Sequence, residues 1–247
     1  MAGSDAGAQA AVRVVTFNIR YGTANDGAHS WPSRRVHLFT TIRDHAPHIL
    51  GVQEALRSQL DEIAAAVPGY RELGSGRDDG RTAGEYSALL VDTARFDIVT
   101  HGQFWFSDRP EEPGSMTWGN KYPRICVWAR LADRATGDTI LVFNQHWDHE
   151  VQPSRERSAT LLLSRMAALG AHRLPTLVMG DFNSGEQNPA FQRLLANSRF
   201  WLRDTYRVVA PDAKVVGTFN GFKGDSAGEK IDAILVTRQW TVLDAVI

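Results

Sequence analysis

The chain of 247 residues has little of several features that would mark other kinds of protein. Its one cysteine, Cys126, rules out an intramolecular disulfide, which fits either a reducing compartment or a protein that does not depend on disulfides. No apolar run approaches the ~18 residues that a membrane-spanning helix needs. Residues 1–11 carry neither the basic nor the apolar segment of a secretory signal, and we interpret them as a disordered tail. These absences lead us to expect a cytoplasmic protein.

A surplus of charge of one sign is also lacking. The chain has 27 basic and 28 acidic residues, which gives a formal net charge of −1. Proteins that grip long nucleic acids usually carry a basic surplus, so this balance favours a small-molecule ligand over long duplex DNA. A local basic patch stays possible. Hydrophobic residues at 43% and charged residues at 22% are typical of a globular protein with a sizeable core.

Short apolar runs rich in β-branched residues alternate with helical patterns along the chain. They predict a single mixed α/β domain over residues 12–247, because no shift in composition marks a boundary. The predicted strands are Val12–Phe17, Ile49–Gln53, Ser87–Val91, Ile125–Leu131, Thr139–Asn144, Thr176–Met179 and Ile231–Val236. The predicted helices are Ser33–His45, Leu56–Val67, Ser154–Leu169 and a shorter one that begins at Pro189.

Polar side chains stand at the ends of four predicted strands. Asn18, Glu54 and His146 each end a largely apolar run, and Asp181 and Asn183 follow the fourth. Rigid strands that end together can hold such side chains at one mouth of the fold. The sequence therefore predicts one cluster of these residues.

The residue types in this cluster suit phosphoester chemistry. Mg²⁺ prefers oxygen ligands and keeps several waters, so Glu54 and the carboxamide of Asn18 suffice, with Asn18 either a ligand or a donor to bound water. Mn²⁺ is a possible substitute. His146 can donate to a phosphate, Asp181 can orient or deprotonate a water, and Asn183 can donate to the transition state.

Each of these residues also has a simpler structural interpretation. Asn18 fits a turn at a strand end, Glu54 fits the acidic start of a helix, and Gly180–Asp181 fits a strand-to-loop turn. Taken alone, each simpler interpretation is the stronger one. The combination, in the order Asn, Gln-Glu, Asn-x-His and Gly-Asp-Phe-Asn, is far more specific.

With these motifs in this order, the sequence resembles the endonuclease/exonuclease/phosphatase superfamily, whose members have the DNase I-like fold. The stretches Phe104–Ser107, Pro113–Ser115 and Thr218–Phe222 resemble a bacterial-type subgroup without an assigned substrate. The segments that match the superfamily are Thr16–Arg20, Val52–Glu54, Gly84–Ser87, Pro123–Ile125, Asn144–His149, Gly180–Asn183 and Lys230–Asp232.

The resemblance implies an α/β four-layer sandwich in which two mostly antiparallel β-sheets lie face to face, flanked by helices. It implies hydrolysis of a phosphodiester or phosphomonoester by in-line attack of a metal-assisted water. It assigns Asn18 and Glu54 to the metal, and His146, Asp181 and Asn183 to the phosphate and the water. The expected partner is a phosphorylated small molecule or a nucleic acid, and we expect a monomer.

Five further positions are weaker candidates. Tyr86 matches a position that often contacts the phosphate, or is an aromatic at a sheet edge. Arg124 is a second phosphate binder or part of a surface ion pair. His149 lines the pocket or is a solvated loop histidine. Asn220 and Phe222 are candidates to hold the leaving group.

The C-terminal end departs from the superfamily pattern. Members close with a Ser-Asp-His segment, and Asp232 matches the aspartate that orients its histidine. The sequence ends at Ile247 without that segment, so we expect the domain to lack it and the last strand. A fragment, a natural truncation of weak activity, and a catalytically impaired relative that binds a phosphorylated ligand or metal all fit this pattern.

Overall fold

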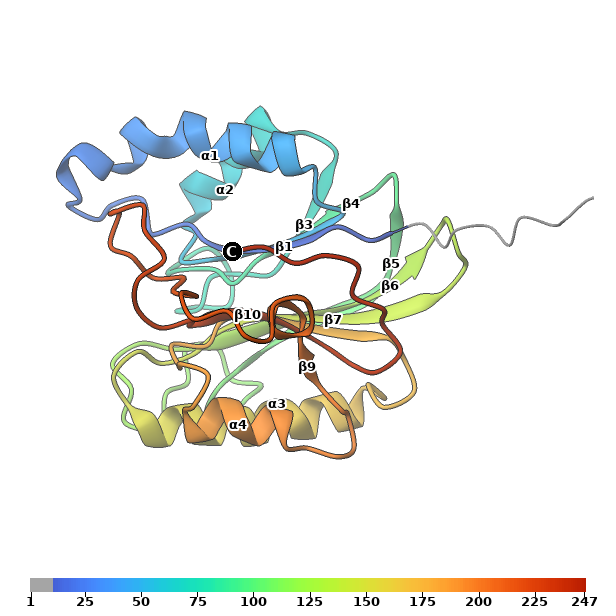
Figure 1. The fold of residues 1–247 in the computed structure, drawn as a ribbon. Coiled ribbons are helices and arrows are strands. Elements are labelled where there is room, and N and C mark those ends of the chain that lie inside the picture. The colour runs from blue at the N-terminus through green and yellow to red at the C-terminus, as the bar shows by residue number, and fades with distance from the viewer. Residues whose placement is uncertain (1–10) are drawn as a thin grey trace, which may run out of the picture.

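A computed structural model describes residues 11–247 (Figure 1). The predicted tail lies outside these residues, except for Ala11, which belongs to no helix or strand. The strands are β1 (Val14–Asn18), β2 (Ile49–Gln53), β3 (Tyr70–Leu73), β4 (Leu89–Asp92), β5 (Phe96–Trp105), β6 (Ile125–Asp133), β7 (Thr139–His146), β8 (Thr176–Asp181), β9 (Arg203–Asp204) and β10 (Asp232–Val236). The helices are η1 (Gly27–His29), α1 (Trp31–His45), α2 (Arg57–Ala66), α3 (Gln152–Ala168), α4 (Pro189–Leu195) and α5 (Thr205–Val209).

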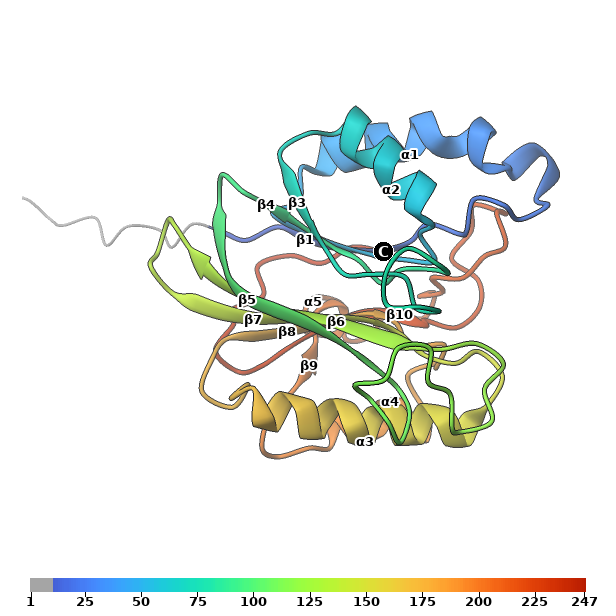
Figure 2. The same ribbon diagram turned by 180° about the vertical axis from the view of Figure 1, so that it is seen from behind.

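The strands form two sheets that lie face to face. One has the order β1-β2-β4-β3 and the other the order β5-β6-β7-β8-β10-β9. The pairs β1–β2 and β7–β8 are parallel and the other pairs are antiparallel. Helices α1 and α2 cover the outer face of the first sheet, and α3 and α4 cover that of the second (Figures 1 and 2). The predicted four-layer sandwich with mostly antiparallel sheets is confirmed.

Three hydrophobic cores fill the spaces between the four layers. Strand β7 shows how the sequence builds them. Its residues Ile140 and Val142 join the core between the sheets, while Leu141 and Phe143 join the core under α3 and α4. A strand buried on both faces reads as a continuous apolar run, which is why the sequence predicted this strand so clearly.

Strands β3, β5 and β9 and helices η1 and α5 were not predicted from the sequence. Strand β5 lies at the edge of its sheet, and the exposed polar residues Asp97, Thr100 and His101 interrupt its apolar residues. Strand β9 has two residues and α5 has five, which are too short for periodicity to detect.

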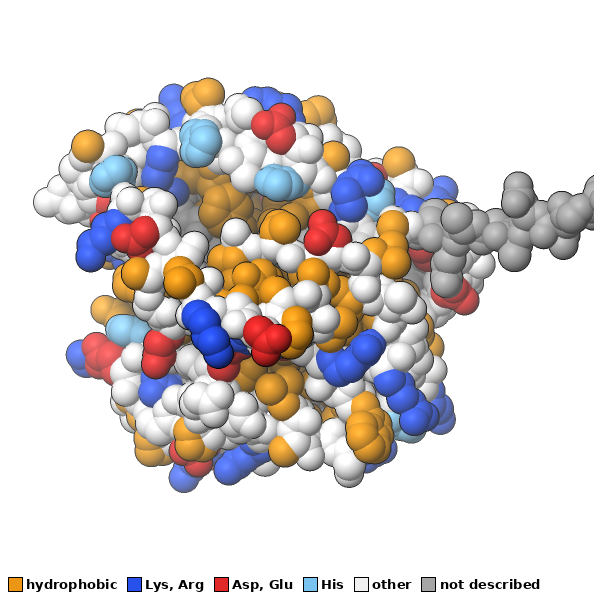
Figure 3. All heavy atoms as spheres, in the orientation of Figure 1, with side chains coloured by type: hydrophobic (Ala, Val, Ile, Leu, Met, Phe, Trp, Pro, Cys, Tyr) orange, Lys and Arg blue, Asp and Glu red, His pale blue; other side chains and the backbone are white. Residues whose placement is uncertain are grey.

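The chain ends in the middle of the face shown in Figures 1 and 3, where hydrophobic side chains gather. Trp240 and Val242 pack against the core between the sheets, while Leu243 and Val246 are exposed. Over residues 11–247, β1 pairs with β2 alone and forms one edge of its sheet. The same residues contain no helix long and apolar enough to cross a membrane.

Candidate active site

The candidate site lies where strands from both sheets end. The parallel strands β1 and β2 finish at Asn18 and just before Glu54, and the parallel strands β7 and β8 finish at His146 and Asp181. Strand β10 runs antiparallel to β8 and starts there, so Asp232 pairs with Asp181 in the register. The fold thus brings together residues that are up to 214 positions apart, as the strand-end pattern predicted.

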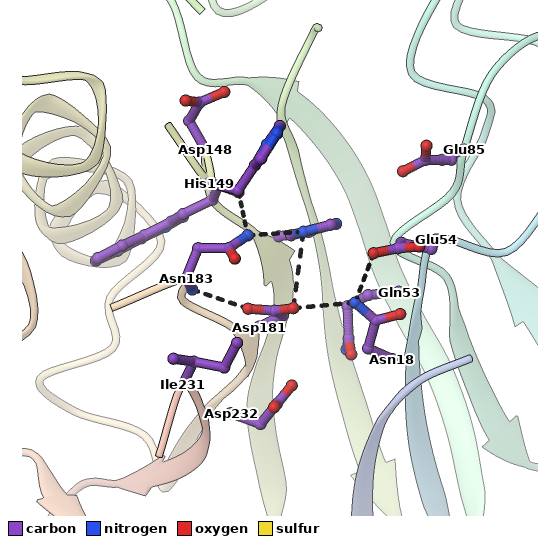
Figure 4. Close-up of polar contacts among 12 residues, drawn as sticks. Asn18, Gln53, Glu54, Glu85, Asp148, His149, Asp181, Asn183, Ile231 and Asp232 are labelled. Carbon is purple, nitrogen blue, oxygen red and sulfur yellow. Dashed lines mark hydrogen bonds and ion pairs between the residues drawn. The ribbon is translucent and has the colours of Figure 1, made fainter. Parts of the chain in front are cut away.

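Asn18 bridges the two sheets at this point. Its Nδ2 donates to Glu54 Oε1 and to Asp181 Oδ2, each at 2.9 Å (Figure 4). Its Oδ1 accepts a hydrogen bond from the backbone N–H of Arg20 at 3.0 Å. The amide nitrogen therefore faces the carboxylates, and the side chain acts here as a donor that spaces two acids.

Two of the site residues have left-handed backbone conformations. Glu54 has φ of 61° and Asn183 has φ of 44°, in a region that costs a non-glycine residue about 1–3 kcal/mol. Strain of this kind persists only where the surrounding structure holds it. The left-handed conformation directs the chain at Glu54, just after β2, and at Asn183, two residues after β8, so that both side chains lie in the site.

His146 is a neutral side chain surrounded by donors. Its Nε2 lies 2.9 Å from Asn183 Nδ2 and 3.2 Å from Arg124 Nη1, and both partners can only donate. Nε2 therefore accepts, and the ring proton sits on Nδ1. Burial, together with the charges of Arg124, Arg77 and His149, holds the pKa of His146 well below its ordinary value. Two donors share one lone pair, so this side of the site has a surplus of donors.

Arg124 is buried, with 3% of its surface exposed, so the surface ion pair considered from the sequence is wrong. Besides His146, its guanidinium donates from Nη2 to His149 Nδ1 at 2.6 Å and from Nε to the buried Asp148 at 3.4 Å. His149 is half-exposed at the rim and stacks near Tyr122. Arg124 is therefore fixed with a terminal nitrogen beside His146.

The opposite side of the site is acidic. Burial and the charge of Asp232 raise the pKa of Asp181 to about 8, and burial raises the pKa of Asp232 to about 6. Oδ1 of Asp232 is buried and has no hydrogen-bond partner among the described residues. Buried polar atoms are normally paired, so a cation or a donor is the natural complement here.

The acidic side fits Mg²⁺ by its donor chemistry. Glu54, Asp181 and Asp232 supply carboxylate oxygens, the ligands that hard cations prefer. Within residues 11–247, no three His, Cys, Asp or Glu side chains come close enough to cage an ion on their own. Mg²⁺ needs no such cage, because it keeps several waters and takes one or two carboxylates plus substrate oxygens.

Three predicted residues are engaged differently. Tyr86 borders the site, but its hydroxyl donates to the backbone carbonyl of Arg81 at 2.9 Å. Asn220 Nδ2 donates within its own loop, and Phe222 stacks on His29 with ring centroids 4.8 Å apart. In the part of the chain that the structure describes, no hydrogen bond joins Asn220 or Phe222 to the cluster.

Two ionisable residues beside the site were not predicted from the sequence. Arg77 and Glu85 border the same recess as Arg124 and His146. Glu85 could have been identified from the sequence, because it lies in the segment Gly84–Ser87 that matches the superfamily. Arg77 offered no signal, because it lies in a loop without periodicity.

Comparison with known proteins agrees with this architecture. A protein-family model described as Endonuclease/Exonuclease/phosphatase family matches residues 15–247. The structure of an endonuclease/exonuclease/phosphatase from Bacteroides vulgatus is 35% identical, with a TM-score of 0.85 over 92% of this chain and 87% of that chain. The mannosyl-6-phosphatase of Bacteroides thetaiotaomicron VPI-5482 is 34% identical, with a TM-score of 0.84 over 92% of this chain and 86% of that chain.

A curated relative, an uncharacterized protein of Acanthamoeba polyphaga mimivirus, is 24% identical over 205 residues. The match covers 76% of this chain and 27% of the relative, so the chain spans about a quarter of that protein's length. The family-model match extends over nearly the whole chain and includes every residue of the cluster described above. The chain belongs to the endonuclease/exonuclease/phosphatase family.

Proposed function

We propose that this protein is a divalent-metal-dependent phosphoester hydrolase that works as a monomer. One observation carries the proposal: a donor half made of Arg124, His146 and Asn183 faces an acidic half that includes Glu54 and Asp181, across a single mouth. A phosphoryl group bound to a cation needs both halves. The chain's membership of the endonuclease/exonuclease/phosphatase family and its similarity to a mannosyl-6-phosphatase support it.

The donor half would bind the phosphoryl oxygens. Arg124 Nη1 and Asn183 Nδ2 both crowd the lone pair of His146, and a phosphoryl oxygen would accept from them in its place. The negative charge of the phosphoryl group would raise the pKa of His146, so that its ring takes a proton and donates as well. All three donors then stabilise the negative charge that develops on the phosphoryl oxygens in the transition state.

The acidic half would hold the cation and the attacking water. Glu54, with Asp232 beside it, would hold Mg²⁺ or Mn²⁺, which when bound polarises the phosphoryl group and offsets the charge of the leaving oxygen. Asp181 would orient the water and accept its proton, since burial and the neighbouring Asp232 raise the pKa of its carboxyl and make it a stronger base. Asn18 would keep Glu54 and Asp181 at their fixed spacing.

The test is hydrolysis of p-nitrophenyl phosphate, bis(p-nitrophenyl) phosphate and mannose 6-phosphate with Mg²⁺, with Mn²⁺ and with EDTA. Glu54→Ala and His146→Ala should lower kcat by about a hundredfold to a thousandfold. His101→Ala, an exposed histidine on β5, is the matched control and should retain full activity. Turnover that persists in EDTA, or that survives Glu54→Ala, would contradict the proposal.

A further inference from the structure

Arg77 and Glu85 form an ion pair in the loop between β3 and β4 that the proposed chemistry leaves without a role. Arg77 Nη1 and Nη2 donate to the two oxygens of Glu85 at 2.6 and 3.0 Å. The Arg77 residue is only 7% exposed. Loops are usually exposed, and a buried ion pair contributes little to stability after the cost of desolvating both charges. A buried ion pair in this loop therefore indicates a role other than stabilising the loop.

The loop itself fixes the pair in place. The backbone N–H of Arg77 donates to the carbonyl of Glu85 at 3.1 Å, so the two residues lie opposite each other. Trp105 Nε1 donates to the carbonyl of Arg77 at 2.6 Å. The Arg77 guanidinium is therefore positioned by a backbone that is tied to β5, as a preorganised binding group must be.

The pair borders a recess that it shares with two residues of the donor half. Arg77 and Glu85 line this recess together with Arg124 and His146. The ring of Tyr122 covers the Arg77 guanidinium from the other side, 5.1 Å away. Arg77 and Arg124 thus present two guanidinium groups to one recess beside His146.

Arg77 retains unused hydrogen-bonding capacity. A guanidinium has five N–H donors, and Glu85 accepts one from each terminal nitrogen. The buried Nε has no hydrogen-bond partner among the described residues, and the nearest carboxylate oxygen, Asp78 Oδ1, is 3.8 Å away. A buried donor without a partner is uncommon, so the guanidinium has hydrogen-bonding capacity that the described residues do not fill.

We propose that Arg77, oriented by Glu85, is the second guanidinium beside Arg124 in a recess for the terminal oxygens of a phosphomonoester dianion. A monoester carries nearly two negative charges at neutral pH, whereas a diester carries one, so the monoester gains more from a second guanidinium. The walls also exclude a second ester chain on this side, because Tyr86, Ser87 and Ile125 are each 2% exposed. This inference rests on the proposed function and specifies its substrate class.

The experiment compares a monoester with a diester in variants that remove the pair without leaving a lone buried charge. The double variant Arg77→Met/Glu85→Leu removes both charges, and such replacements usually leave stability nearly unchanged. Arg77→Lys keeps the positive charge but loses the planar guanidinium, which can donate to two oxygens at once. The matched control is Arg95→Met/Asp133→Leu, which removes another two-bonded ion pair, between the turn before β5 and the end of β6.

The double variant should lose about tenfold to a hundredfold in kcat/KM for p-nitrophenyl phosphate, with less than about a threefold change for bis(p-nitrophenyl) phosphate. Arg77→Lys should shift the same ratio in the same direction, and it decides the question if the double variant does not fold. The control should leave the ratio unchanged. A folded variant of Arg77 with the wild-type ratio would overturn the inference.

A failure of the proposed function gives a different result. If the wild-type protein turns over neither ester, that function fails, and calorimetric titration with inorganic phosphate decides the role of Arg77. Affinity about tenfold weaker in the double variant, and unchanged in the control, would support the recess. Equal affinities in all three proteins would overturn it.

Discussion

Asn144 ties the two sheets together two residues before His146. The side chain lies on β7, is fully buried and crosses to the other sheet. Its Nδ2 donates to the carbonyls of Val52 at 3.1 Å and Ala88 at 2.8 Å, and its Oδ1 accepts from Gln53 Nε2 at 2.7 Å. Substitution of this side chain therefore tests how the two halves of the site are held in register.

The variant Asn144→Leu keeps the volume but removes three hydrogen bonds to buried partners. At about 1 kcal/mol each, the loss should lower the free energy of unfolding by about 3 kcal/mol. For a chain of this size that corresponds to a Tm lower by about 6–12 °C. Urea unfolding followed by tryptophan fluorescence would measure the change in the free energy of unfolding. The control is Asn25→Leu, at an exposed position.

The variant Asn144→Asp tests the same hydrogen bonds between the sheets more specifically. It places a carboxylate oxygen against the carbonyls of Val52 and Ala88, so at pH 8 it should be at least as destabilising as Asn144→Leu. The pKa of the new carboxyl would be raised in the folded state, so stability should recover as the pH falls to about 5.5. Wild-type stability of either variant, or no response of Asn144→Asp to pH, would refute the cross-sheet role.

Two further predictions concern β8. Gly180 has φ of 138°, and a Cβ there would lie 1.9 Å from the carbonyl oxygen of Gln145, so Gly180→Ala should destabilise by more than about 3 kcal/mol in urea unfolding. Gly137→Ala, at φ of 78° with open space around it, isolates the backbone cost and should lose only about 1–2 kcal/mol. Burial first, and the charge of Asp232 second, raise the pKa of Asp181 to about 8 from 3.8, so the folded state binds the extra proton between these values. Stability in EDTA should therefore fall as pH rises through about 8, and thermal melts of Asp181→Asn should show a flatter profile.

Much of the fold could be predicted from the sequence because its strands are buried on two sides. Continuous apolar runs identified β2, β6, β7 and β8 to within a few residues. The edge strand β5 could not be found in this way, because exposed polar residues such as Asp97, Thr100 and His101 interrupt its apolar residues. Periodicity reports burial, and it fails where burial is partial.

The cluster of Asn18, Glu54, His146 and Asp181 was predictable for a geometric reason. Strand ends that share one edge of a sandwich must meet, whatever the loops do. The direction of the Asn18 amide was not predictable, because it depends on acceptors from both sheets. Arg77 was not predictable either, because its burial depends on the fold of a loop rather than on any local pattern.

The most direct test of the proposed site is a crystal structure of the protein soaked with Mg²⁺ and inorganic phosphate. The phosphate oxygens should lie within hydrogen-bond distance of Arg124, His146 and Asn183, with the cation bound to Glu54. A phosphate bound elsewhere, or a cation that does not contact Glu54, would contradict the division into a donor half and an acidic half.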